Sequence, residues 1–146
     1  MVPALETVFP GLAGKDYRVT SPKDDVYNCI AWSAGVIDDW WWPDKAGQGH
    51  WPAGVPREAT IDAFRRMFLS LGFEPCTGAE SEPGLEKIAL FATDAGVPKH
   101  AARQLPTGRW TSKLGIMEDI EHELRDIEGA AYGSVTFIMK RKRAEA

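Results

Sequence analysis

The sequence predicts an α+β domain whose helices come first and whose antiparallel sheet follows. Two observations favour this class. Helical features are concentrated at residues 29–34 and 60–71, while the chain after residue 73 alternates short apolar runs with turns that contain glycine or proline. A run of helices followed by a run of strands is typical of α+β domains. Because 146 residues suit one domain of ordinary size, we expect a single domain over residues 1–146 with N-terminal helices packed on a C-terminal sheet.

Composition and charge narrow the class of protein. Hydrophobic residues make up 44% of the chain, which suits an ordinary globular core, and the formal net charge of −4 argues against nucleic-acid binding. The first residues lack the basic and apolar regions of a secretory signal, and no apolar run is long enough to span a membrane. We therefore expect a cytoplasmic protein with reduced cysteines and no membrane partner.

Two terminal segments are expected to lie outside the packed core. Residues 1–24 are predicted to be irregular, with one short extended piece at 17–19. Residues 140–146 include four consecutive basic side chains after the last apolar run, a pattern typical of a solvated tail.

The first predicted helix has Cys29 in its first turn or so and runs to about Ala34. The turn-prone run before it ends in Asp24 and Asp25, and either carboxylate could cap the helix. Gly35 is a suitable stop. A loop rich in glycine and proline follows at 47–56, and long ordered loops often carry function.

A second helix is predicted over residues 60–71, because Ile61, Phe64 and Phe68 recur at helical spacing and Gly72 follows. The remaining elements are expected to be mostly strands. They are a short strand or turn at 73–76, an apolar strand at 87–92, a hairpin with arms at 100–105 and 109–114, a helix at 117–127 and a closing strand at 134–139.

Cys29 is the candidate nucleophile because it falls in the first turn of the first predicted helix. The positive end of a helix dipole favours thiolate over thiol, and the thiolate is the reactive form. A cysteine in this position, with a histidine elsewhere, is the opening half of a cysteine-hydrolase site. The alternative is a small buried hydrophobic residue, which describes most lone cysteines.

His100 is the candidate base among the three histidines of the chain. It stands at the start of the first hairpin arm, where it could face a helix packed on the sheet and take the thiol proton. His50 lies in the glycine-rich loop and could line a cleft. His122 lies among carboxylates in the predicted 117–127 helix, where we expect a structural or solvated side chain.

A catalytic histidine usually needs an orienting group, and the sequence offers four candidates: Ser112, Thr111, Gln104 and Asp119. Ser112 is favoured because its strand is expected to pair with that of His100. The backbone N–H of Cys29 and the side chain of Asn28 could hold an oxyanion, although Asn28 would serve equally well as a cap residue.

Four tryptophans near the long loop form a candidate substrate-binding surface, with His50 beside them: Trp40, Trp41, Trp42 and Trp51. Consecutive side chains cannot all point into a core, so at least one should lie at a surface or groove. The cluster is either a lid over the core or a platform for a peptide, sugar or aromatic ligand.

No cofactor and no metal are expected. The five cysteine and histidine residues are widely scattered, with neither a CxxC nor an HExxH motif. The sequence also has no Walker-type loop and no GxGxxG before a helix.

The order of a cysteine at a helix start and a histidine at a strand start resembles the papain-like cysteine hydrolases, of which the NlpC/P60 and CHAP branches are nearest in size. The resemblance implies a papain-like fold with Cys29 as nucleophile, His100 as base and Ser112 or a neighbour as third residue. The chain departs from that pattern, because the strand after His100 has no His, Asn or Asp at its middle.

Longer motifs resemble an uncharacterised bacterial domain family of unknown function, which implies no activity. They are YNCIAW at 27–32, WWWP at 40–43, WPAGVPRE at 51–58, HAARQL at 100–105 and GRWTSKLG at 108–115.

The sequence therefore predicts a cysteine hydrolase, a peptidase or amidase, that acts on a peptide or another amide, thioester or related acyl compound. A rival of a different class is a non-catalytic peptide- or protein-binding module on the same fold, which would use the tryptophans. A third prediction is a toxin-type effector or its cognate partner.

Overall fold

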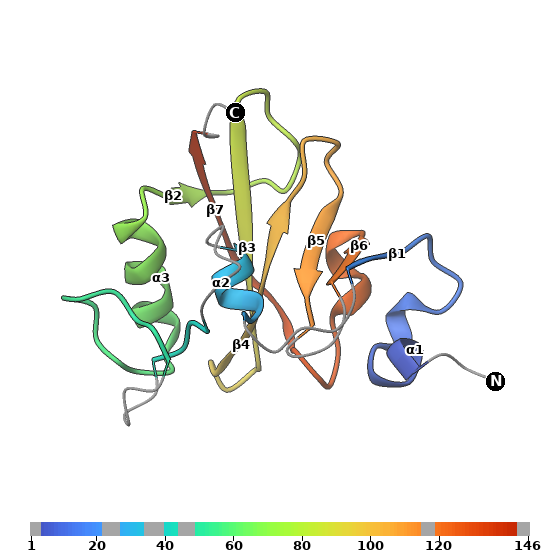
Figure 1. Cartoon of the computed structure of the whole chain (residues 1–146), viewed down its shortest axis with the longest axis horizontal. Helices are drawn as coiled ribbons and strands as arrows, with labels where there is room; N and C mark the ends of the chain where they lie inside the picture. The colour runs from blue at the N-terminus through green and yellow to red at the C-terminus, as the bar shows by residue number, and fades with distance from the viewer. Residues whose placement is uncertain (1–3, 22–26, 34–39, 44–48, 115–118, 143–146) are drawn as a thin grey trace.

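The computed structural model describes residues 4–21, 27–33, 40–43, 49–114 and 119–142, and they are organised by one seven-stranded sheet (Figure 1). The strand order is β1-β6-β5-β4-β3-β7-β2, and every neighbouring pair is antiparallel. The strands are β1 (Arg18–Ser21), β2 (Glu74–Cys76), β3 (Leu85–Ala92), β4 (Pro98–Gln104), β5 (Trp110–Lys113), β6 (Asp119–His122) and β7 (Ser134–Lys142). The helices are α1 (Ala4–Val8), α2 (Cys29–Ser33) and α3 (Ile61–Ser70), with 3-10 turns η1 (Pro10–Leu12) and η2 (Leu124–Ile127).

The predicted papain-like α+β fold, with N-terminal helices on a C-terminal sheet, is wrong. Among the described residues α3 is the longest helix, with ten residues, whereas α1 and α2 have five each. Strand β1, from a segment predicted to be largely irregular, forms one edge of the sheet. It pairs with β6, and Arg18 forms an ion pair with its register partner Glu121. The sheet therefore draws strands from both halves of the chain.

The predicted helix at 117–127 is also wrong within the described residues. Its residues form strand β6 and the 3-10 turn η2. The spacing of Ile120, Leu124 and Ile127 suits a helix, and all three are buried. Pairing with β1 on one side and β5 on the other gives β6 two ladders of hydrogen bonds, and this tertiary pairing outweighs local propensity.

Several predicted elements are confirmed. Helix α3 begins after Thr60, whose side chain accepts a hydrogen bond from the N–H of Ala63, and Gly72 follows its end with φ +91°. The helix that contains Cys29 is also present, but α2 begins only at Cys29 and is capped by the side chain of Asn28, so the predicted cap by Asp24 or Asp25 is wrong. The predicted hairpin is formed by β4 and β5. Asp24, Asp25 and the predicted stop at Gly35 themselves lie outside the described residues.

The basic cluster predicted as a solvated tail is partly strand, because β7 continues through Lys142. Arg141 is half-buried, bonds Glu86 through its Nε at 2.6 Å and donates to the carbonyl of Leu71 at 2.9 Å. These contacts join the end of β7 to β3 and to the turn after α3.

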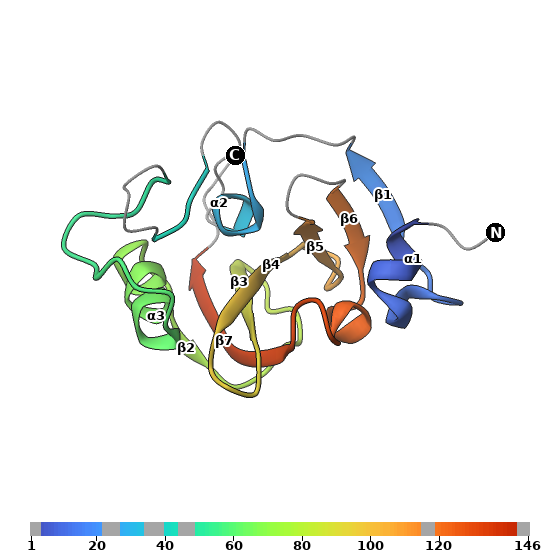
Figure 2. The same cartoon turned by 90° about the horizontal axis from the view of Figure 1, so that it is seen from below.

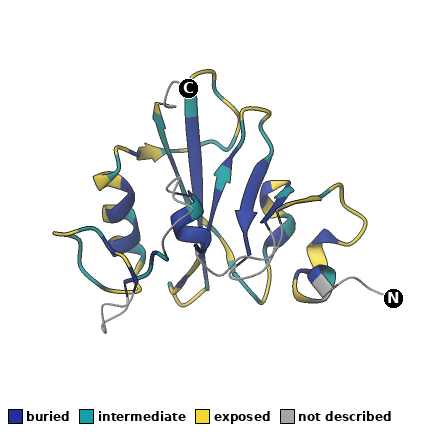
Figure 3. Ribbon diagram, viewed as in Figure 1, coloured by how far each residue is buried: buried dark blue, intermediate teal, exposed yellow. Residues whose placement is uncertain are grey.

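The sheet has buried side chains on both faces. Alternate residues of β3 enter two different clusters: Ile88 and Leu90 pack with α2, α3 and the tryptophans, while Ala89 and Phe91 pack with α1, η1 and η2. Helix α2 lies against β4 and β5 (Figure 2). Burial is therefore concentrated in α2 and the central strands, while the loops and the outer side of α3 are exposed (Figure 3). Within the described residues, no helix has both the length and the apolar character needed to cross a lipid bilayer.

Candidate functional site

The side chain of Asn28 fixes the start of α2. Its Oδ1 accepts hydrogen bonds at 3.1 Å from the backbone N–H groups of Ala31 and Trp41, and its Nδ2 donates to the carbonyl of Trp41 at 2.7 Å. The first bond is that of a helix cap, and the other two bind the tryptophan segment to the helix. The amide is therefore engaged in holding the site together, and the backbone N–H of Cys29 is the better donor for an oxyanion.

The thiol of Cys29 is buried beneath this cap, with only 6% of the residue exposed. Burial raises the pKa of Cys29 to about 11, because a thiolate there loses its hydration. Backbone hydrogen bonds from Ala101, Ile30 and Cys29 itself, and the charge of Lys113, act in the opposite direction but do not outweigh burial. The expectation of a resting thiolate is therefore wrong: the sulfur carries its proton at neutral pH.

A pocket of about 360 Å³ opens onto Cys29. Its walls include the rings of Trp40, Trp42 and Tyr132, and the remaining described lining residues are Asn28 and Lys99. Lys99 is exposed, so an ammonium group stands at an otherwise largely aromatic site. The structure thus brings two of the four predicted tryptophans to the candidate nucleophile.

The other members of the predicted binding surface have structural contacts. Trp41 and Trp51 are buried, and the indole N–H of Trp51 donates to the carbonyl of Pro56 at 2.9 Å. His50 is exposed, and its ring lies 4.6 Å from that of Trp41. None of these three is among the described residues that line the Cys29 pocket.

His100 lies on β4, where its register partner is Phe91 and the two rings are 5.3 Å apart, and it is fully buried. Its ring is stacked on Tyr132, with centroids 4.1 Å apart and planes 2° from parallel. Ala101, the next residue, donates its backbone N–H to the sulfur of Cys29. Tyr132 links the two residues: its ring stacks on His100, and it lines the pocket together with Cys29, whereas His100 is not among the described residues that line it.

The two nitrogens of His100 have different surroundings. Nε2 lies 2.9 Å from Oγ of Ser112, whereas Nδ1 is buried with no hydrogen-bond partner within the described structure. Burial, assisted by the nearby His122, lowers the pKa of His100 well below its usual value. The ring is therefore a neutral imidazole.

Of the four orienting groups that the sequence offered, Ser112 is the one that hydrogen-bonds His100. Gln104 instead donates to the carbonyl of Ala79 at 2.6 Å, and Asp119 accepts from the hydroxyl of Tyr27 at 2.7 Å. Thr111 is buried on β5, where its register partner on β4 is Arg103.

Sequence reasoning missed two residues of the site, His122 and Tyr132. His122 is fully buried on β6, with Nε2 at 2.7 Å from Oγ of Ser112 and Nδ1 at 2.7 Å from the carbonyl of Glu123. Burial lowers its pKa to about 4. A strand assignment at 119–122 would have placed His122 beside β5, but its acidic neighbours suggested a solvated helix. No pattern in the sequence marks Tyr132.

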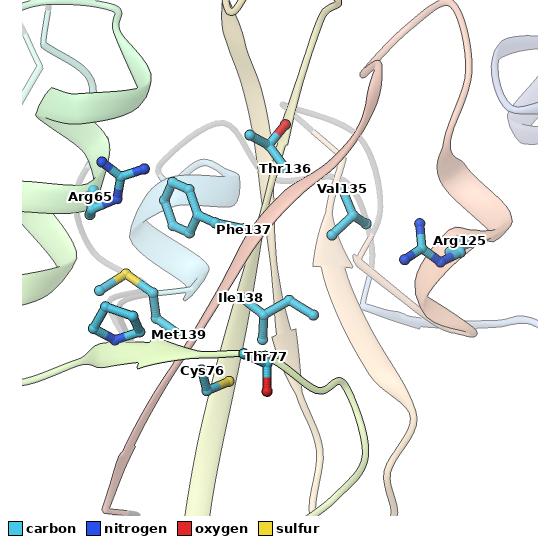
Figure 4. Close-up of a pocket in the computed structure, with 10 residues that line it drawn as sticks. Arg65, Cys76, Thr77, Arg125, Val135, Thr136, Phe137, Ile138 and Met139 are labelled. Atoms are coloured by element: carbon cyan, nitrogen blue, oxygen red, sulfur yellow. The ribbon is translucent and has the colours of Figure 1, made fainter.

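The second cysteine lies in a different pocket, of about 400 Å³, across β7 (Figure 4). Cys76 and Cys29 are both free thiols. Arg65 and Arg125 stand on opposite sides of β7 in this pocket. Arg65 lies over the ring of Phe137 and near Asp62, and Arg125 pairs with Glu128 at 3.1 Å, so both cations already have partners.

The described residues include no group of three or more His, Cys, Asp or Glu side chains that could hold a metal ion.

Comparison with known proteins gives one match. A family model described as a domain of unknown function (DUF7689) matches residues 18–140. No curated protein and no solved structure matches the chain.

Proposed function

The chain belongs to the DUF7689 family, a family of unknown function, and we propose that it is a thiol-dependent acyl hydrolase with Cys29 as nucleophile and His100 as general base. One observation carries the proposal. A cysteine at a helix N-terminus lines a pocket together with Tyr132, and Tyr132 stacks on a buried histidine that has its Nε2 held by Ser112 and its Nδ1 without a partner within the described structure. A nucleophile, a base and a group that orients the base are the parts that covalent acyl transfer needs.

The neutral state of both side chains determines the first step. The sulfur of Cys29 attacks the acyl carbon while its proton passes to Nδ1 of His100, so that no free thiolate accumulates. The carbonyl oxygen becomes an oxyanion, to which the backbone N–H of Cys29 would donate a hydrogen bond. When this intermediate collapses, the bond to the amine or thiol leaving group breaks, and His100 returns the proton to that group.

Water completes the reaction. His100 takes a proton from water as the oxygen attacks the acyl–Cys29 thioester, and the carbon–sulfur bond breaks. The proton returns to the sulfur, and the product is a carboxylic acid. The overall change is an acyl compound plus water giving an acid plus an amine or thiol.

The pocket supports a substrate with an apolar or aromatic acyl group. Its volume lies at the low end of the range for small-molecule sites, so one side chain or a short acyl chain would fill it. Trp40, Trp42 and Tyr132 would contact that group, and Lys99 would favour a carboxylate or other anionic group at the entrance.

A turnover assay tests the proposal. Thioesters, activated esters and peptide amides with aromatic acyl groups would be compared in the native protein, Cys29→Ala and Cys76→Ser. Hydrolysis that is lost to background in Cys29→Ala and kept in Cys76→Ser supports the proposal. Hydrolysis that survives in Cys29→Ala contradicts it.

A second candidate function is a non-catalytic pocket for an aromatic or apolar peptide side chain. The raised pKa of Cys29 and the full burial of His100 favour it, because both suit a static, dry site. Binding of hydrolysis-resistant peptides without any turnover, and equally tight binding by Cys29→Ala, would establish this function. Trp40→Ala should weaken binding under either function, whereas Cys76→Ser should not.

The toxin-type effector stays a prediction that no described feature favours.

A further inference from the structure

A line of three buried polar side chains runs across β4, β5 and β6 behind the Cys29 pocket. His100, Ser112 and His122 each come from a different strand and are all fully buried. Oγ of Ser112 lies 2.9 Å from Nε2 of His100 and 2.7 Å from Nε2 of His122. Burying three polar groups is unfavourable unless each is hydrogen-bonded. The donor and the acceptor of each hydrogen bond in the line can be identified as follows from its chemistry.

The hydrogen bond at the His122 end of the line determines which atom donates in each of the other hydrogen bonds. Nδ1 of His122 lies 2.7 Å from the carbonyl oxygen of Glu123, and a carbonyl only accepts. Nδ1 of His122 must therefore carry a hydrogen. With a pKa of about 4, lowered by burial, His122 is a neutral imidazole at physiological pH and has one hydrogen only. Its Nε2 is consequently an acceptor.

The acceptor role of Nε2 in His122 also fixes the donor and acceptor roles of Ser112 and His100. The hydroxyl has a single hydrogen, and the bare Nε2 of His122 requires it. Oγ of Ser112 can then only accept from His100, so Nε2 of His100 carries the hydrogen of that ring. Nδ1 of His100 is left as a bare lone pair, in agreement with its lack of a partner within the described structure.

We propose that His122 is a positioning residue that acts through Ser112 to hold His100 in the Nε2–H tautomer, with Nδ1 free to accept a proton. The inference rests on the proposed function for its catalytic consequence, since Nδ1 is the atom that would take the proton of Cys29. The tautomer itself does not depend on that function. Without His122, the hydroxyl of Ser112 could turn and donate to His100, and the hydrogen of the ring would then block Nδ1.

Nitrogen-15 NMR of the histidine rings tests the inference in the intact protein. Protonated and bare ring nitrogens resonate in well-separated regions, and the chain has only three histidines. We expect Nε2–H for His100 and Nδ1–H for His122 at neutral pH, while the exposed His50 serves as the internal reference. A native protein with Nδ1–H on His100 would overturn the proposal.

Three variants test whether His122 fixes the tautomer of His100 through its hydrogen bond to Ser112 or only fills space in the core. In His122→Phe and in Ser112→Ala, His100 should acquire a detectable Nδ1–H population. In His122→Gln, the side-chain oxygen can accept from Ser112 while its amide donates to the carbonyl of Glu123, so the native tautomer should return. A tautomer that stays the same in both disrupting variants would contradict the proposal.

Kinetics and thermal melts complete the test. With a hydrolysed substrate, kcat of His122→Phe should fall at least about tenfold with little change in KM, because a histidine in the wrong tautomer cannot act as base. His122→Gln should recover most of that loss. If His122→Phe fails to fold, the native spectrum and Ser112→Ala still decide the tautomer. If Cys29→Ala shows that the protein is no hydrolase, the NMR spectrum still decides whether His122 holds His100 in the Nε2–H tautomer.

Discussion

At the sulfur of Cys29, hydrogen bonding and burial act in opposite directions. Three backbone N–H groups and the charge of Lys113 favour the thiolate, and burial favours the thiol. Helix α2 has only five residues, so few aligned peptide dipoles contribute at its N-terminus. Burial prevails, and the site needs a base at the moment of attack rather than a pre-formed ion pair.

Alkylation should consequently favour the other cysteine. Treating the native protein with limiting iodoacetamide at neutral pH should label the half-buried Cys76 before Cys29, because Cys29 is both shielded and protonated. Peptide mapping by mass spectrometry reports both sites in one experiment. Unfolding in denaturant should make the two rates similar, which is the control. Faster labelling of Cys29 in the native protein would mean that its thiolate is stabilised after all.

The buried His122 should make stability depend on pH. Its pKa falls from 6.5 in the unfolded chain to about 4 in the fold, so the unfolded state binds the proton first as pH drops. The contribution of His122 to stability should therefore decline from about pH 6.5 towards pH 4 and then level off, by on the order of 3 kcal/mol. Denaturant unfolding across this range should show a shallower decline for His122→Gln. If the free energy of unfolding fell equally steeply with pH in the native protein and in His122→Gln, the burial of a neutral His122 would be contradicted.

At the scale of elements, the strongest agreement between sequence and structure is α3. Phe64 and Phe68 lie on its buried face, and the rings of Trp42 and Trp51 pack on Phe64 at 5.3 and 5.1 Å. A ten-residue helix with one apolar face can be predicted from local spacing alone. Its partners on the sheet cannot, because they come from distant parts of the chain.

Replacing Phe64 tests how much α3 depends on this packing. Phe64→Ala should lower the free energy of unfolding by about 3–5 kcal/mol, through lost burial and the cavity left under the tryptophans. Leu69→Ala on the same helix is the matched control, since Leu69 is 45% exposed and its loss should cost less than about 0.5 kcal/mol. Equal effects of the two substitutions in denaturant melts would show that the packed face of α3 is misassigned.

Strand pairing explains which parts of the site could be predicted. The pattern of β4 and β5 indicates a hairpin, and pairing of its two arms is enough to predict that Ser112 lies near His100. Strand β6 has only four residues, and its apolar spacing fits a helix equally well. Its assignment depends on tertiary pairing with β5 on one side and, on the other, with β1, roughly 100 residues away along the chain. His122 was missed for this reason.

At the scale of the whole molecule, the groups that His100 would act on and the groups that orient His100 lie in different directions from it. On one side of His100, α2 and the tryptophan segment bring Cys29 and an apolar pocket to β4. Towards the β1 edge, Ser112 and His122 continue a buried line of hydrogen bonds along neighbouring strands. Groups held on paired strands are positioned more rigidly than groups on loops, which suits a directional relay.

The most direct test of the central claim is to look for an acyl group on Cys29. The native protein would be mixed with an aromatic thioester at neutral pH, quenched in acid within the first turnover and analysed by intact mass and peptide mapping. We predict a mass increase equal to the acyl group on the peptide that carries Cys29, formed roughly 10²- to 10⁴-fold more slowly in His100→Gln. Acylation confined to Cys76, or acylation of Cys29 at the same rate in His100→Gln, would contradict the assignment of Cys29 and His100 as nucleophile and base.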